Sequence, residues 1–182
     1  EAPRVRYGPY FEGEGHAAAY MKEGTFRLEE LSLKNEKLRV TAQGAYDMEK
    51  RSIKGGKVKG HAKGQAFERW LPKPVEFQKL EATWNLHGPV DRLNHEFTAA
   101  LNRLETETSM PADMKLTAKG EKTLLTEAEA TYSVRNNPSS KLHANFKGRF
   151  DATAGRPSAG SEMTIYHETD SPVQLSLNLR NS

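Results

Sequence analysis

Apolar residues occupy every second position in one stretch of this chain after another, from about Phe11 almost to its last residues. The clearest stretches are Leu38-Val40-Ala42, Leu80-Ala82-Trp84-Leu86, Leu142-Ala144-Phe146 and Val173-Leu175-Leu177-Leu179. A period of two places these side chains on one face of an extended strand and the intervening Lys, Glu, Thr, Ser and Asn on the other. The pattern therefore predicts long β-strands, each with one apolar and one polar face.

Short polar turn sequences separate these stretches, as at residues 23–24, 34–36 and 136–140. Short turns join antiparallel neighbours, so the chain is expected to run back and forth as a meander of ten or eleven strands. The alternation shifts by one residue between Glu30 and Leu31, which predicts a β-bulge. Residues 91–104 fit a strand or a helix, and the strand is favoured because its neighbours are strands.

One short segment departs from the alternation. Phe67, Trp70 and Leu71 are spaced i, i+3, i+4, and Pro72 and Pro74 follow them. This spacing predicts one short helix near residues 65–71, which the prolines end. The remainder is predicted to be an all-β, mostly antiparallel domain over residues 1–182, in which the sheet forms either an open groove or a sandwich.

Composition excludes several classes of protein. The chain has 182 residues and no cysteine, so it forms no disulfide and no thiolate metal site. Its mean hydropathy is −0.78, and no apolar run approaches the ~18 residues that a membrane-spanning helix needs. With 27 basic and 24 acidic residues the charge is nearly balanced, which does not indicate a nucleic-acid partner.

The residue types that carry catalysis do not form a convincing constellation. None of the six histidines pairs with another at a spacing typical of metal ligands. His95-Glu96 and His167-Glu168 resemble the start of a metalloprotease motif, but the fourth residue after each histidine is Ala99 or Ser171. We therefore expect no metal, no cofactor and no enzymatic activity, with a carboxylate pair from distant strands as the enzymatic alternative.

A basic segment carries six positive charges within 14 residues, at Lys50, Arg51, Lys54, Lys57, Lys59 and Lys63. One interpretation is a solvated strand face whose lysines discourage edge pairing. The other is a site for phosphorylated head groups. Nucleic acid is disfavoured because no aromatic residues interleave with the lysines to provide stacking platforms.

Two further features have more than one interpretation. The small residues at Gly13-Gly15-Ala17-Ala19 and Gly56-Gly60-Ala62-Gly64 either admit bulky neighbours or keep space for a long apolar ligand.

The last strand, from Val173 to Leu179, contains neither a charge nor a proline. Such an edge invites pairing with another strand unless the strand is interior or covered, so the chain is also interpreted as a segment of a longer β structure.

The segment from Leu31 to Asp47, LSLKNEKLRVTAQGAYD, resembles the unit "strand, Asn turn, strand, Gly, Tyr-Asp" of AsmA-like and TamB-like envelope proteins. Residues 53–64, Trp70-Leu71-Pro72 and Trp84-Asn85-Leu86-His87-Gly88 are similar in style. The resemblance implies a long sheet folded into an apolar groove, the β-taco. It also implies a periplasmic segment of a protein for lipid transport or outer-membrane biogenesis in the bacterial cell envelope. The implied partners are phospholipid or another acyl-chain lipid, an outer-membrane barrel protein, and further segments of the same chain.

Under this interpretation the apolar face shields acyl chains. The predicted groove lining is Phe26, Leu28, Leu38, Val40, Leu80, Trp84, Leu86, Leu116, Tyr132, Phe146, Ile165, Leu175 and Leu177. Lys57, Lys59 and Lys63 are the candidates for contact with a lipid head group. The alternative is a closed, non-enzymatic β-sandwich that binds a protein or a glycan through surface aromatics such as Tyr7, Tyr10 and Tyr20.

Overall fold

The computed structural model describes residues 3–7, 11–68, 71, 75–107, 109–137, 139–169 and 173–179. They form one sheet of thirteen strands and two short 3-10 turns. The elements are β1 (Arg4–Tyr7), β2 (Phe11–Lys22), β3 (Thr25–Lys34), β4 (Leu38–Asp47), β5 (Ser52–Lys63), η1 (Gly64–Ala66), β6 (Lys79–Pro89), η2 (Val90–Arg92), β7 (Asn94–Leu104), β8 (Ala112–Glu121), β9 (Leu124–Val134), β10 (Lys141–Asp151), β11 (Arg156–Pro157), β12 (Ser161–Glu168) and β13 (Val173–Leu179).

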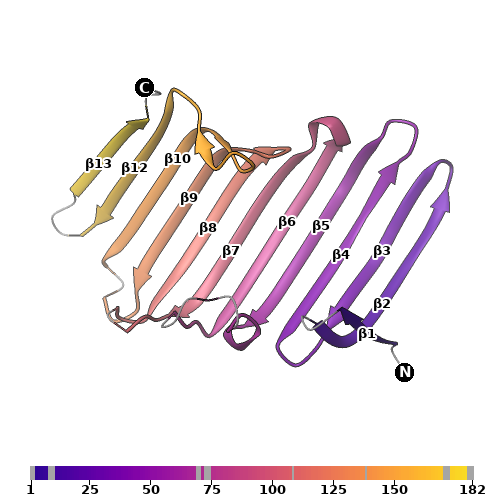
Figure 1. Cartoon of the computed structure of the whole chain (residues 1–182), viewed down its shortest axis with the longest axis horizontal. Coiled ribbons are helices and arrows are strands. Elements are labelled where there is room, and N and C mark those ends of the chain that lie inside the picture. The colour runs from indigo at the N-terminus through magenta and orange to yellow at the C-terminus, as the bar shows by residue number, and fades with distance from the viewer. Residues whose placement is uncertain are drawn as a thin grey trace.

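The sheet is an antiparallel meander in which strand order follows chain order from β1 to β10 and then continues through β12 to β13 (Figure 1). The two-residue β11 pairs with the end of β10, off this path. The predicted all-β, antiparallel architecture is confirmed. The strand count was predicted too low, because the short β1 and β11 carry no readable alternation. The described residues form one sheet rather than the two stacked sheets of a sandwich.

This sheet is a single open layer. The chain exposes 13057 Å², whereas a compact monomer of 20.4 kDa exposes about 8,800 Å². Among the described residues only two apolar side chains are fully buried, Ala62 and Ala112. Backbone ladders and cross-strand side-chain pairs, rather than a central core, therefore hold the described part of the chain together.

Cross-strand register sorts the residues into two chemically distinct faces. Val58 of β5 pairs with Ala42 of β4 and with Trp84 of β6, and Trp84 pairs in turn with Phe97 of β7. Directly opposed residues project to the same side, so this row and its neighbours make one continuous apolar face. Among the residues that the described register places on it, none is Lys, Arg, Asp or Glu.

Bulges preserve this sorting where the sequence alternation slips. Between β3 and β4 the register jumps from Leu28 to Leu31, which keeps both leucines on the apolar face. This confirms the bulge predicted beside Glu30. Similar shifts occur between β4 and β5, β5 and β6, and β9 and β10. Each bulge increases the local twist of its strands, so the sheet is not a flat ribbon.

The connection from β5 to β6 differs from the prediction. In place of the predicted helix, the described residues of this connection contain a 3-10 turn at Gly64–Ala66, and the amide of Leu71 donates to the carbonyl of Phe67 at 3.0 Å. A Cβ on Gly64 would lie 1.8 Å from the carbonyl oxygen of Phe77, so only glycine fits where the returning chain passes. Trp70 lies outside the described residues.

Two other segments test the strand assignments. Residues 94–104 form β7, so the strand interpretation of that region is confirmed over the helix. The next strand, β6, begins at Lys79, and before it Glu76 forms an isolated bridge to Glu105. The Glu76 and Glu105 backbones exchange hydrogen bonds of 3.0 and 2.8 Å there.

Candidate functional site: the apolar face

All thirteen residues predicted to line a groove hold register positions on the apolar face. Leu38 and Leu80 pair with Ala62 from its two sides, and Ile165 of β12 pairs with Ala144 and with Leu175. Phe26 pairs with Tyr46, and it lies on the same side as Leu28 because the two are two residues apart in a regular stretch of β3. Leu177 is placed by its pairing with Met163, while its side chain lies outside what the structure describes.

The prediction missed several residues that belong to the same surface. They are Leu33, Tyr46, Val58, Phe97, Leu101, Met114, Leu142 and Met163. The alternation that identified the others contained the signal for these as well, because each stands two residues from a predicted member or directly across from one. Phe97 was the hardest of these residues to assign from the sequence, because residues 91–104 also fitted a helix.

A row of small residues crosses the middle of this face. It comprises Gly60, Ala82, Ala99, Ala130 and Ala144, interrupted by Leu116 between Ala99 and Ala130. We refer to it as the small-residue row. A Cβ built on Gly60 would meet nothing within 4 Å, so the space above it is open.

Bulkier residues flank the small-residue row on both sides. One flanking row contains Leu80, Leu101, Met114, Tyr132 and Leu142, and the other contains Val58, Trp84, Phe97 and Phe146 with Ala118 and Ala128 between the two phenylalanines. On β6, β7 and β10 the face is thus low along its centre and higher on both sides, whereas on β8 Leu116 fills the centre beside the small Ala118.

Large apolar side chains on this face remain open to solvent. Trp84 is 43% exposed, Phe26 and Leu142 are each 42% exposed, and Leu175 is 60% exposed. Given the spacing of strands and residues, the apolar rows cover on the order of 1,500 Å². Continuous apolar patches on monomers rarely exceed a few hundred Å², so this surface is unusually large, and surfaces of this kind are candidates for interaction sites.

His95 lies on the apolar face beside Trp84, and its contacts explain how a polar side chain is accommodated there. The ring lies edge-on to Trp84, with centroids 6.2 Å apart, and directly over Gly120, where a Cβ would come within 2.7 Å of it. Its Nε2 donates to the carbonyl oxygen of Lys122 at 3.1 Å. His95 therefore secures the β8–β9 turn, and its polar atom is satisfied within the protein.

The three lysines predicted to contact a head group lie on the opposite face. Lys57 pairs with Asn85, and Lys59 pairs with Thr41 and Thr83, all of which belong to polar rows. Lys63 pairs with Lys79 at the end of β5. Because the sheet itself separates these side chains from the apolar face, a lipid lying on that face does not meet Lys57 or Lys59, and that part of the prediction is not retained.

The polar face balances its own charges. Lys119 reaches Glu96 at 3.8 Å, and Lys57 and Lys59 share a pocket of about 260 Å³ with Glu29 and Glu30. A hydrogen bond from Lys79, together with its charge, lowers the pKa of Glu81. Among the described residues, cations and carboxylates are therefore interleaved on this face.

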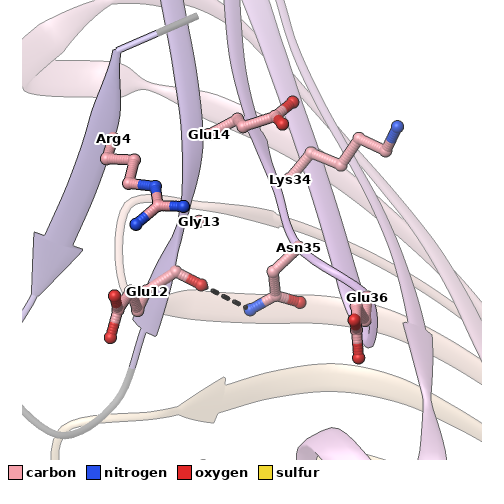
Figure 2. Close-up of a pocket in the computed structure, with 7 residues that line it drawn as sticks. All are labelled: Arg4, Glu12, Gly13, Glu14, Lys34, Asn35 and Glu36. Carbon is pink, nitrogen blue, oxygen red and sulfur yellow. Dashed lines mark hydrogen bonds between the residues drawn. The ribbon is translucent and has the colours of Figure 1, made fainter.

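The corner between β1, β2 and β3 holds an open pocket of about 420 Å³. Figure 2 shows that its charged side chains point in different directions rather than converging on one point. Asn35 donates to the carbonyl of Glu12 at 3.3 Å, and its side-chain oxygen accepts from the amides of Lys37 and Leu38 at 2.9 and 2.7 Å. Asn35 thus has a structural role here, which is to hold the β3–β4 turn.

The grouping on the polar face that most resembles a catalytic site joins Thr131, His143 and Glu168. His143 lies 3.4 Å from the Thr131 hydroxyl and 3.0 Å from a Glu168 carboxylate oxygen, and its hydrogen bond, followed by the charge of Lys141, lowers the pKa of Glu168. Thr131 lies in mid-strand, where its backbone pairs with β8 and β10. Thr131 and His143 both lie within the paired register of their strands, so their backbones belong to the sheet ladder.

The described residues contain no group of three or more His, Cys, Asp or Glu side chains arranged to hold a metal ion. No helix among them has the length and apolar character to cross a membrane. Comparison of the chain with protein-family models, curated proteins and solved structures finds no match.

Proposed function

We propose that this chain shields the acyl chains of lipids on the apolar face of its sheet. The observation that supports the proposal is the size of that face together with the lack of any covering layer among the described residues. Trp84, near the centre of the apolar face, is 43% exposed. An uncovered apolar surface of this extent costs free energy in water, and a ligand that covers it recovers that cost.

Acyl chains suit the relief and chemistry of this face. The small-residue row and its taller flanks offer methyl, methylene and aromatic contacts, with no charge in the described register. Each methylene removed from water contributes roughly 0.8 kcal/mol, so two acyl chains could gain on the order of 10 kcal/mol before ordering costs. Because the face is open along its length, a polar head group can stay hydrated while the tails are covered.

The cellular setting follows from the resemblance to AsmA-like and TamB-like proteins. We propose a periplasmic segment of a lipid-transport or outer-membrane biogenesis protein in a bacterial envelope, with phospholipid as the ligand. In this setting an outer-membrane barrel protein and further segments of the same chain are the additional partners. The continuous face from β2 to β13 supports the proposal because it would let a lipid move across successive strands without meeting a charged side chain.

The test compares one charge placed on each face. Trp84→Arg puts a guanidinium in the centre of the apolar face, whereas Thr98→Arg puts it on the exposed polar side of the adjacent strand β7. We expect a fluorescent fatty acid to bind the unmodified chain and Thr98→Arg equally, and to bind Trp84→Arg at least about tenfold more weakly, since burying a charge against a tail is costly. Circular dichroism checks that both variants are folded.

Two outcomes would contradict the proposal. One is failure of the unmodified chain to bind the fatty acid and to retain any lipid detectable by native mass spectrometry. The other is equal loss of binding in folded Trp84→Arg and Thr98→Arg, because that would place the ligand elsewhere than on the apolar face.

A further inference from the structure

The two edges of the sheet differ in how they are protected. At one edge, β1 is only four residues long, carries the exposed Arg4 and Arg6, and pairs with the first part of β2 (Figure 1). Short strands and charges of this kind discourage further strand pairing. At the other edge, β13 spans seven residues, contains no charged residue and no proline, and pairs on one side with β12. Its second side has no partner strand among the described residues.

An unprotected strand offers a full row of backbone N–H and C=O groups to an incoming strand. The choice of partner follows from the sequence of β13, Val-Gln-Leu-Ser-Leu-Asn-Leu. Read in either direction, this segment alternates apolar and uncharged polar residues about its central Ser176. In antiparallel self-pairing about that residue, Leu175 of one copy would stand opposite Leu177 of the other, and Gln174 opposite Asn178.

We propose that β13 pairs antiparallel with β13 of a second copy of this chain, with the two-fold axis passing through Ser176. Self-pairing sets every residue against a residue of the same character, and no like charges meet because β13 has none. The two-fold axis stands perpendicular to the sheet, so both apolar faces lie on the same side of one continuous sheet. A two-fold contact uses the same strand edge of both copies, so it closes on itself and gives a dimer rather than a filament.

The contact is small. Stable specific interfaces bury roughly 1,200–2,000 Å² of total surface area, and two paired seven-residue strands bury less than this. Association is therefore weak and depends on protein concentration. The inference does not require that the apolar face bind lipid, since it rests on the backbone edge and the sequence of β13.

Single cysteines provide the test, because the chain has none of its own. Directly opposed residues of an antiparallel pair have Cα atoms about 4.5–5.5 Å apart, which suits a disulfide. Ser176→Cys is therefore expected to give a crosslinked dimer under mild oxidation. Asn178→Cys is the matched control. In the proposed register its two copies are four residues out of step, roughly 13 Å along the strands, which is too far for a bond.

Sedimentation equilibrium of the unmodified chain supplies an independent readout. We expect a monomer–dimer equilibrium that Ser176→Lys shifts to monomer, because the two lysines would face each other, while Thr98→Lys on the interior strand β7 leaves it unchanged. A monomer at all concentrations, or crosslinking of Asn178→Cys as readily as of Ser176→Cys, would overturn the proposal. So would a dimer that persists in Ser176→Lys, which would point to another interface. None of these outcomes depends on lipid binding, so the two proposals fail separately.

Discussion

The two faces of this sheet share one backbone and differ in nearly everything else. On the polar face, side chains satisfy one another, as where Arg135 donates twice to Asp113, at 3.0 and 2.8 Å. On the apolar face, Trp84 and its neighbours contact each other across the strands, and no described residue forms a layer above them. The comparison shows that the described sheet keeps its register although only its polar side chains find partners within the chain. The uncovered face is the one to which the proposed function is assigned.

The largest effect is expected at Gly120, where the apolar face is tightly packed. This prediction distinguishes the packed part of the face from the open part. In Gly120→Ala the added Cβ would lie 2.1 Å from the Leu124 carbonyl oxygen and would meet His95. We expect a loss of about 3 kcal/mol of unfolding free energy. Gly60→Ala, at an open position of the same face, is the control and should stabilise by roughly 0.5 kcal/mol. Chemical denaturation measures both, and equal effects would contradict the description of the face.

The second prediction asks whether Trp84 belongs to a packed interior. In a closed core, Trp→Ala costs about 3–5 kcal/mol. Because Trp84 is 43% exposed, Trp84→Ala in the lipid-free chain is expected to cost only about 1–2 kcal/mol. Denaturation of delipidated protein provides the measurement. A loss as large as that of a packed core would mean that protein covers this face after all.

The third prediction concerns the polar face and acid. Asp113 is partly desolvated, which raises the pKa, but the hydrogen bond from the Arg103 amide and the contacts with Arg135 outweigh this, so its pKa lies below 3.8. A depressed folded pKa contributes stability that is present above the unfolded value and is lost as the pH falls through the folded value. Asp113→Asn should therefore cost about 1 kcal/mol at pH 7, discounted for exposure. It should also flatten the fall in melting temperature below about pH 4.

Hydrogen exchange at the bulge that contains Arg103 provides a second measurement for the prediction on Asp113. Arg103 has a φ of +52° and lies within the register shift from Leu101 to Leu104, and Asp113 accepts its backbone N–H at 2.9 Å. Hydrogen exchange should increase at this bulge in Asp113→Asn and stay unchanged at the β12–β13 pair. An unchanged acid profile in the variant would show that Asp113 does not carry the linkage.

The smallest effect is expected from a single exposed ion pair. Glu96 and Lys119 are 3.8 Å apart, and about half of each side chain is exposed. Glu96→Ala should change the unfolding free energy by no more than about 0.5 kcal/mol, less at high salt. Melting curves at low and high salt test this. A larger loss would mean that the polar face depends on individual pairs rather than on the ladder as a whole.

Much of the fold could be predicted from local sequence, because a strand with one apolar and one polar face requires apolar residues at every second position. The bulge near Glu30 was predictable for the same reason, since a bulge shifts that period by one. That residues such as Leu38 and Trp84 share one face could also be predicted, because it required only an assignment to one side of a strand; that they line a lipid groove stays a prediction. Their pairing across strands came from the short turns that join neighbours.

What could not be predicted depends on contacts between residues distant in sequence. The close passage of the Phe77 carbonyl over Gly64 could not be predicted from local spacing, and the spacing of Phe67, Trp70 and Leu71 indicated a helix where the described residues form a 3-10 turn. The lysines of β5 stood out by their density, but only the register showed that they lie opposite the apolar face. Whether one layer or two would form was equally hidden, because alternation is the same in an open sheet and in a sandwich.

The most direct measurement of the central claim is quenching of Trp84 fluorescence by a fatty acid brominated along its tail. The chain contains two tryptophans, so the measurement uses Trp70→Phe, in which Trp84 alone reports. Acyl chains lying on the apolar face should quench this signal in a saturable way, while the unbrominated fatty acid should not. Bound lipid that leaves Trp84 unquenched would contradict the claim that this face is what lipid covers.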